Sequence, residues 1–455
     1  MSRLSSFLNR APIVPLALCL VAAIVFVVGP ISRQRLAVDW PHQRMAIEVV
    51  VIAEPVVKEK VVVVDLLTLQ GHHKLRGRLV RDPHSEQVRL GDGLQVCAYI
   101  NKVHAWQRGH FDYQRYMACH GFSGELWAEP GDWQQKQLPL AGLSLLERTK
   151  FRFLLWRHQL LDRYRQWGIT DKAYGILAAM TLGEKSQLDA TLKDTYSQVG
   201  ASHILALSGL HLMIIYTVIT LLVGWRRFRT ASQVLTVLAM WAFAFLVGLS
   251  PSVVRAAFMI SIYALLSLGH REHMSVNTLA FTAIVMLLVN PLSLYDMGFQ
   301  LSFMAVLTIQ LFGPMLERLI PLHLQMEHRW LKTLWGLISV SLAAQIGTAP
   351  LIAYYFERFA TWFLLSNLVV IPLATLLLYL TLLSICTCWW SGLLALLVTA
   401  LSSIVVLMNS LLEGITRLPL CSIEGIHLSL LQLACVYLLI GCGYVLLSLR
   451  YPRFR

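Results

Sequence analysis

Long runs of apolar residues recur along this chain, separated by short polar connections. A membrane-spanning helix needs about 20 consecutive, mostly apolar residues. One such run covers residues 11–31, and nine more are centred near residues 213, 240, 260, 283, 306, 344, 373, 401 and 439. A polar block, residues 33–200, lies between the first run and the others. This pattern predicts a polytopic α-helical membrane protein of about ten spans with one large insertion.

The composition supports this fold class. Hydrophobic residues make up 56% of the chain and charged residues 14%, with a mean hydropathy of +0.61. Soluble domains average about 25% charged residues. The polar block holds 23 of the 38 basic and 18 of the 25 acidic residues. These values exclude an ordinary soluble globular protein and place most of the extramembrane surface in the insertion.

Lysine and arginine in the short connections predict the orientation, because cytoplasmic loops carry an excess of them. Basic residues precede the first run, follow the second, fourth and sixth runs, and end the chain: Arg3, Arg10, Arg226, Arg227, Arg229, Arg271, Arg318, Arg329, Lys332, Arg450, Arg453 and Arg455. The opposite connections carry only Arg358 and Arg417. We therefore expect both termini in the cytoplasm and the insertion on the other side of the membrane.

Residues 45–130 of the insertion have an all-β pattern. Runs rich in Val, Ile, Leu and Tyr lie near 46–57, 60–70, 75–80, 94–103 and 122–128, separated by turn residues such as Asp82-Pro83. Five short strands in about 85 residues suit an extracytoplasmic barrel of the oligonucleotide-binding (OB) type, although any small β-barrel would share this pattern.

Two interpretations of the barrel surface remain open. Lys74, Arg76 and Arg78 alternate and would share one strand face, and aromatic residues that can stack on bases follow at 106–116. The candidate DNA contacts are Lys74, Arg76, Arg78, Tyr113 and Arg115. The alternative is a plain solvated face, because residues 45–130 hold 10 basic and 10 acidic side chains and nucleic-acid modules usually show a basic excess.

Residues 131–200 connect the barrel to the apolar block. The stretch 143–167 combines six basic residues with interspersed apolar ones, which predicts an amphipathic helix on the membrane surface. Lipid-headgroup anchoring and capture of a polyanion are both compatible with it. We thus expect five regions: an N-terminal anchor (1–32), the barrel (45–130), juxtamembrane helices (131–200), the polytopic domain (201–450) and a basic cytoplasmic tail (451–455).

The eight cysteines show no metal-ligand spacing, and the sequence predicts neither a metal site nor a cofactor. Two of them, Cys97 and Cys119, lie in the insertion. If the insertion faces an oxidising compartment, we expect these two to form a disulfide.

Polar side chains recur near the predicted outer ends of the spans, where each is costly unless it is paired or hydrated. The set comprises His203, Ser208, His211, Arg255, Asp296, Gln300, Gln345 and Asn367. Taken singly, each is explained by an interhelical hydrogen bond worth about 1 kcal/mol, and Arg255 has Asp296 as a candidate partner. Taken together, they favour a polar pathway through the membrane.

Several of these motifs resemble those of the ComEC family of competence proteins. The string Gly200-Ala201-Ser202-His203-Ile204-Leu205-Ala206-Leu207-Ser208-Gly209-Leu210-His211 resembles the family hallmark. Residues 109–116 resemble its signature at the end of the OB-like domain, and later motifs follow in the family's order at 252–256, 290–303, 345–350 and 367–372. The resemblance implies a channel in the bacterial cytoplasmic (inner) membrane that carries one strand of transforming DNA into the cytoplasm.

The resemblance also implies partners. These are single-stranded DNA and the lipid bilayer, a DNA-delivery protein, a cytoplasmic translocase and a separate nuclease, with a homo-oligomer as an open alternative. Many family members continue into a metallo-β-lactamase-like nuclease domain, whereas this sequence ends at Arg455 without a His-x-His-x-Asp-His motif. We therefore expect no nuclease activity in this chain.

Two other functions stay open. An intramembrane hydrolase would use Ser208 as nucleophile with His203 or His211 as its base, since the two groups need hydrogen-bond contact. A small-solute permease would show the same hydropathy.

Overall fold

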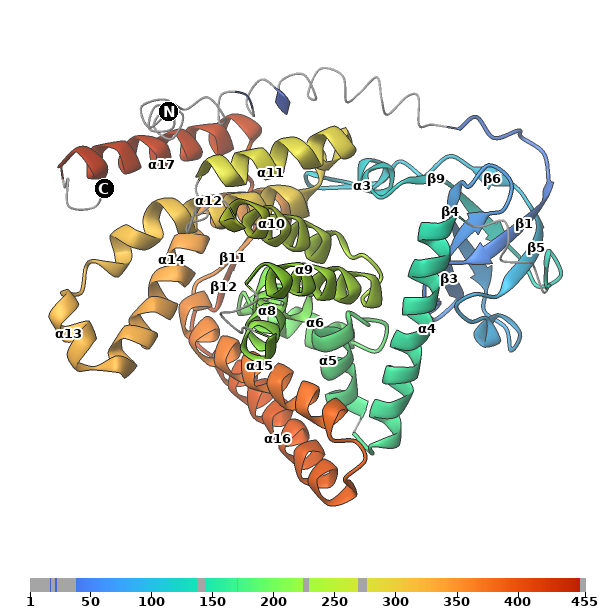
Figure 1. Cartoon of the computed structure of the whole chain (residues 1–455). Coiled ribbons are helices and arrows are strands. Elements are labelled where there is room, and N and C mark those ends of the chain that lie inside the picture. Colours follow the sequence, from blue (N-terminus) through green and yellow to red (C-terminus); the bar gives the residue numbers. More distant parts are fainter. Residues whose placement is uncertain are drawn as a thin grey trace.

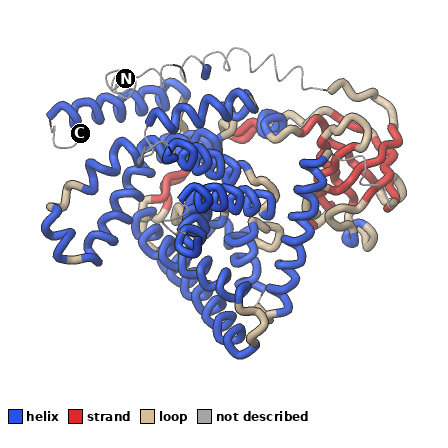
Figure 2. Tube along the Cα trace, in the orientation of Figure 1, coloured by secondary structure: helices blue, strands red, loops and turns tan. Residues whose placement is uncertain are grey.

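The computed structural model describes residues 38–136, 144–169, 171–223, 229–268 and 276–450, together with Ala17, Val21 and Ala22. Almost all of the predicted anchor, the basic positions 226, 227 and 271, and the tail at 451–455 lie outside the described residues. A β-sheet domain stands on one side of the long helix α4 (Leu145–Gln166) and a helical bundle on the other (Figure 1). Figure 2 shows the main sheet gathered at one end of the molecule.

Strands form at the five predicted apolar runs and confirm the β-sheet domain. The main strands are β1 (Met45–Val51), β3 (Val61–Thr68), β4 (Lys74–Val80), β5 (Gly93–Ala98) and β9 (Phe122–Ala128). Shorter strands are β2 (Val56–Val57), β6 (Ile100–Asn101) and β10 (Trp133–Gln135). Alternation explains their burial: along β4, Leu75, Gly77 and Leu79 are buried while the basic residues between them remain partly exposed.

The strand pairings close the sheet into a barrel. β1 pairs antiparallel with β3 and β5, β3 pairs with β4, β4 runs parallel to β9, and β6 pairs with β9. Because β5 and β6 follow each other along one extended segment, that segment joins β1 to β9. Aliphatic side chains fill the interior, including Val49, Val62, Leu66, Leu75, Leu94 and Leu126.

An excursion from the barrel reaches the bundle. The hairpin β7 (Gln107–Arg108) and β8 (Phe111–Asp112) leads into α3 (Tyr113–Cys119), and Asp112 caps α3 by accepting from the Arg115 N–H. The His110 ring stacks on Tyr354 of the bundle with ring centroids 4.0 Å apart. The turn of the hairpin and α3 therefore dock the barrel against the membrane-type helices.

The structure corrects the predicted disulfide, because Cys97 and Cys119 are not bonded to each other and both keep their thiol groups. Cys97 is exposed on β5, the strand that lies between β1 and β10 in the sheet. Cys119 ends α3 on the bundle side, where its Sγ lies 3.2 Å from the Leu292 carbonyl oxygen. The two thiols therefore lie on different sides of the domain.

Helix α4 contacts protein on two sides. Phe151 lies against Gly91 of the barrel, leaving no room for a Cβ there, and Phe153 lies against Phe245 of the bundle with ring centroids 5.7 Å apart. Its N-terminus carries a capping box in which Ser144 and Glu147 satisfy each other's backbone N–H groups. The apolar residues that predicted membrane contact thus also join the two domains.

Helices occupy all nine apolar segments predicted after residue 200. They are α8 (Gly209–Val223), α9 (Arg229–Leu246), α10 (Pro251–Leu268), α11 (Val276–Val289), α12 (Met297–Glu317), α14 (Arg329–Phe356), α15 (Phe363–Cys386), α16 (Ser391–Thr416) and α17 (Leu430–Arg450). Within the described residues, α12 and α14 to α17 are the five long and apolar enough to cross a membrane, and the other four are shorter apolar helices. The total of ten spans stays a prediction.

The segment predicted as juxtamembrane helices holds a different kind of helix. α5 (Asp171–Leu182) is followed by α6 (Ala190–Gln198) and α7 (Ser202–Leu205). In α5, Ile176 and Met180 are fully buried, and the helix packs against α15 and α16. Although α5 lies in the region expected to hold juxtamembrane helices, its faces are apolar and enclosed by the bundle core.

The barrel core predicts an effect for Gly77→Val. A Cβ at Gly77 would lie 2.7 Å from Val64 Cγ2 and 2.8 Å from Leu66 Cδ1, and overpacking of this kind costs about 1–3 kcal/mol. The thermal midpoint of the full-length variant in detergent should therefore fall. Gln95→Val adds the same side chain at an exposed position on β5 and should leave the midpoint nearly unchanged. Equal midpoints for the two variants would contradict this core.

Candidate functional site

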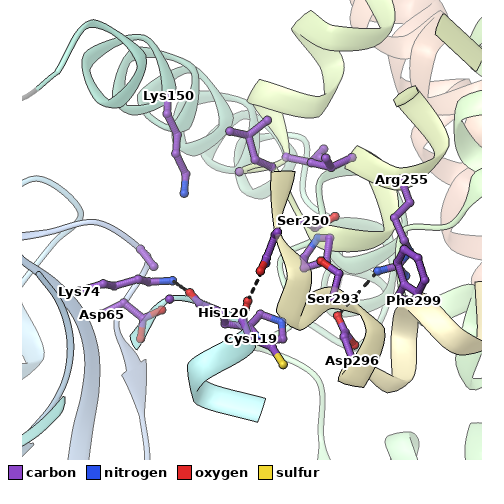
Figure 3. Close-up of a pocket in the computed structure, with 18 of the residues that line it drawn as sticks. Asp65, Lys74, Cys119, His120, Lys150, Ser250, Arg255, Ser293, Asp296 and Phe299 are labelled. Atoms are coloured by element: carbon purple, nitrogen blue, oxygen red, sulfur yellow. Dashed lines mark hydrogen bonds and ion pairs between the residues drawn. The ribbon is translucent and has the colours of Figure 1, made fainter. Parts of the chain in front are cut away.

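A cavity of about 680 Å³ lies where the barrel, α4 and the bundle meet (Figure 3). Its lining includes Lys74 from β4, Lys150 from α4, and Arg255 and Asp296 from the bundle. Lys74 was predicted as a DNA contact, whereas Arg255 and Asp296 were predicted to belong to the membrane pathway. The fold brings one member of the first set and two members of the second to the walls of one cavity.

On the barrel side, most of the predicted basic face is neutralised. Arg76 Nε lies 3.0 Å from Asp65 Oδ1, and Arg78 Nη2 lies 3.2 Å from Glu125 Oε1. The Tyr113 hydroxyl also donates to Glu125, at 2.9 Å. These contacts match the interpretation as a structural face better than one of direct DNA contact by Arg76, Arg78 and Tyr113.

Lys74 differs from these neighbours. Its Nζ lies 3.9 Å from the centroid of the Phe122 ring and 3.5 Å from the carbonyl oxygen of His120. Burial lowers the pKa of Lys74 to about 8, an effect that the Asp65 carboxylate partly opposes. Burial likewise lowers the pKa of Lys150 below its usual range, again opposed by Asp65. The cavity therefore holds two partly desolvated ammonium groups.

On the bundle side, Arg255 is paired. Only 6% of its surface is exposed, its Nη2 donates to Ser302 Oγ at 3.0 Å, and its Nη1 lies 3.9 Å from Asp296 Oδ2. Asp296 also caps α12 by accepting from the Gly298 N–H at 2.7 Å. The structural alternative considered for Arg255, pairing with Asp296, is therefore the arrangement observed.

Ser208 and His211 meet at the start of α8. The Ser208 Oγ lies 3.0 Å from His211 Nδ1, and the Ser208 backbone N–H donates to the same nitrogen at 3.2 Å. Since Nδ1 accepts, the proton of the neutral ring lies on Nε2. His211 is 1% exposed, and its Nε2 has no hydrogen-bond partner within the described parts of the chain. His203, on α7, instead contacts the carbonyl oxygen of Gly200 at 3.2 Å.

The other predicted residues lie outside the cavity lining. Gln300 donates to the Leu294 carbonyl and accepts from the Tyr355 hydroxyl, both at 2.9 Å, which ties α12 to α14. Gln345 is partly exposed on α14, and Asn367 on α15 has a buried Oδ1 without a partner among the residues described. Arg115 lies over the Tyr295 ring at 5.4 Å. The predicted pathway residues thus fall into several separate groups.

Sequence reasoning did not single out Lys150, which the structure places in the cavity lining. It was one of six basic residues in the stretch 143–167, for which lipid-headgroup anchoring and polyanion capture both stayed open, and its only sequence signal was that basic pattern. Its approach to Lys74 depends on how α4 lies across the barrel. Within the described residues, no group of three or more His, Cys, Asp or Glu side chains is placed to hold a metal ion.

Lys74 gives a pH-dependent prediction. Its pKa of about 8 in the fold lies below its ordinary value of 10.5, so the unfolded chain binds more protons between these values and stability rises with pH across that window. Lys74→Met removes the buried charge and should stabilise the protein at pH 7 by about 1–3 kcal/mol, with the gain shrinking toward pH 10.5. Thermal midpoints of both proteins at pH 7 and pH 10 test this, and a constant gain would contradict it.

Comparison with known proteins agrees with the resemblance found in the sequence. A family model described as Competence protein matches residues 180–450. ComE operon protein 3 of Bacillus subtilis is 28% identical over 278 residues, which cover 60% of this chain and 32% of that protein. An uncharacterized protein of Aquifex aeolicus is 31% identical over 206 residues, 44% of this chain and 45% of the relative.

The matched regions thus span less than half the length of each relative. No solved structure matches the chain. The family model covers more than half of the 455 residues, and the chain therefore belongs to the Competence protein family, as its resemblance to ComEC proteins predicted.

Proposed function

We propose that this protein is a multi-pass channel of the bacterial cytoplasmic membrane that carries single-stranded DNA into the cytoplasm during natural competence. The observation that carries the proposal is the shared cavity, where Lys74 of the barrel and Arg255 of the bundle line the same space. A DNA strand is a polyanion and needs a hydrated route with cationic or hydrogen-bonding walls. The cavity offers such walls between the extramembrane domain and the apolar helices.

The barrel topology supports an OB-type domain at the entrance to this route. Its main strands form a closed five-membered arrangement in which β4 and β9 are parallel and the β5–β6 segment closes the ring. A small five-stranded barrel of this kind binds oligonucleotides in many proteins. We propose that the barrel receives the strand and passes it toward the cavity.

Contacts of the four predicted outer loops support the proposed orientation. Leu292 contacts Cys119 of α3, and Gly248 lies against Leu154 of α4. Two further contacts involve α6: Arg358 Nη1 lies 3.1 Å from Asp194 Oδ1, and Cys421 Sγ lies 3.7 Å from the Gln198 carbonyl oxygen. All four loops thus contact the segment 38–200, as expected if that segment and these loops lie on one side of the membrane.

An intramembrane hydrolase is the second candidate, because Ser208 and His211 are in hydrogen-bond contact. A catalytic histidine is normally oriented by a third group that accepts from its other ring nitrogen. In the described structure His211 Nε2 lacks such a partner. The two contacts to Nδ1 also resemble a helix cap, since Ser208 directly precedes α8 and His211 is its third residue. The channel is therefore the better-supported function.

Transformation by variant proteins distinguishes the two candidates. Arg255→Ala leaves the partly buried Asp296 carboxylate without its partner, a change that costs up to about 3–5 kcal/mol, and should reduce transformation sharply. His203→Ala and His211→Ala should act in the same direction. Ser208→Ala should have a milder effect, because a channel needs no nucleophile at this position. Transformation frequency in a deletion strain carrying each variant tests this.

Arg255→Lys, which retains a positive charge, is the matched control, and membrane levels of each variant must equal those of the wild type. A completely inactive Ser208→Ala beside active histidine variants would favour the hydrolase. Normal DNA uptake by the deletion strain would refute the channel. Normal transformation by all three of Arg255→Ala, His203→Ala and His211→Ala would refute it as well.

The orientation gives a separate prediction. In a cysteine-free background, Lys136→Cys beside the barrel should react with a membrane-impermeant thiol reagent in spheroplasts, whereas Lys332→Cys should react only after lysis. Both positions are exposed in the structure. Protection of a cysteine from the reagent therefore means that the membrane lies between them, because the protein does not bury either position. The reverse labelling pattern would overturn the proposed topology.

A further inference from the structure

We infer that Lys74 and Lys150 together bind a phosphate group of the DNA strand at the junction between barrel and bundle. The inference rests on the proposed function and assigns to it a specific anion-binding site. Both side chains line the cavity and come from different elements, β4 and α4. In Figure 3 the two ammonium groups extend into the same space between barrel and helices.

The first argument is charge balance around the cavity. Each carboxylate in the lining has a basic partner: Asp65 has Arg76 at 3.0 Å, Glu54 has His158 at 3.1 Å, and Asp296 has Arg255 at 3.9 Å. Arg157, also in the lining, is paired with Glu184. By contrast, neither lysine has a carboxylate within 4.0 Å in the described part of the chain.

The two lysines are therefore the cations of this cavity that lack a close counter-ion. A partly desolvated charge without a partner is costly. An anion that enters the cavity would supply the missing partner for both ammonium groups at once.

The second argument is preorganisation. The Phe122 ring lies beneath Lys74 and the His120 carbonyl oxygen accepts from it, so the stem of this lysine is held while the ammonium keeps donors for a ligand. Lysine is a compact point charge with three donors and a common phosphate ligand. Two such groups from different elements of one cavity wall suit a single phosphate.

The third argument is the position and size of the cavity. Its volume of about 680 Å³ falls within the range of about 300–1,000 Å³ typical of small-ligand sites, which gives room for a nucleotide segment of a single strand. Its walls combine barrel strands with the Arg255–Asp296 pair of the bundle. This location between the two proposed parts of the route favours DNA phosphate over a phospholipid headgroup.

The test uses the full-length protein in phosphatidylcholine nanodiscs and measures binding of fluorescent oligothymidylate by anisotropy across a range of salt concentrations. For single strands, the slope of log K against log salt is proportional to the number of phosphates that the protein neutralises, with about 0.7 for each phosphate. The variant Lys74→Gln/Lys150→Gln should bind more weakly and show a slope reduced by about that amount.

The matched control is Lys58→Gln/Lys60→Gln, which removes the same charge from two exposed lysines of the same barrel. It should retain the wild-type slope. The variant Lys74→Arg/Lys150→Arg should restore most of the affinity, because it keeps both charges. Thermal midpoints of all variants establish that each is folded.

The outcomes separate this site from the wider proposal. If the wild type binds DNA and Lys74→Gln/Lys150→Gln keeps its affinity and slope, this site is refuted and the channel proposal stands. If the wild type does not bind the oligonucleotide even at low salt, both are refuted. Loss of co-purified phosphatidylglycerol from the double variant, with an unchanged DNA slope, would assign the site to lipid and overturn the inference.

Discussion

A charge removed from water needs a counter-charge, and this constraint organises the junction on which the structure depends. Breaking a buried ion pair by removing one partner costs about 3–5 kcal/mol. Arg157 of α4 is buried with Glu184, which follows α5, and Arg255 of α10 is buried with Asp296 at the start of α12. Each pair joins elements that apolar packing alone would leave free to slide, since hydrophobic contact has no fixed direction.

The same constraint explains where the barrel sits. Its docking contacts are few and directional, and they include the His110 ring stacked on Tyr354 and Asn290 donating to the Cys119 carbonyl oxygen at 3.3 Å. Together with α4 they hold the barrel beside the bundle (Figure 1). In the walls of the cavity between the two domains, Arg157 and Arg255 are held by Glu184 and Asp296, and Asp65 is held by Arg76.

The proposed function depends on the two lysines that this arrangement leaves without a close carboxylate. Arg76, Arg78 and Arg255 are engaged in ion pairs or hydrogen bonds, whereas Lys74 and Lys150 face the cavity. A channel for a polyanion needs cations that can release the ligand, and half-buried lysines suit this better than an arginine fixed by a carboxylate. The Ser208–His211 contact, by comparison, is explained by capping at the start of α8.

The sequence by itself determined the features that depend on local periodicity. Period-two alternation placed Lys74, Arg76 and Arg78 on one face of β4, and apolar runs located nine apolar helices of the described chain after residue 200. The motif residues also allowed the pairing of Arg255 with Asp296 to be anticipated. Only the tertiary structure decided which distant residues meet: it enclosed α5, separated Cys97 from Cys119, neutralised Arg76 with Asp65 and brought Lys150 to Lys74. Such contacts depend on how whole elements pack across the barrel and the bundle. The spacing of residues along one element does not determine that packing.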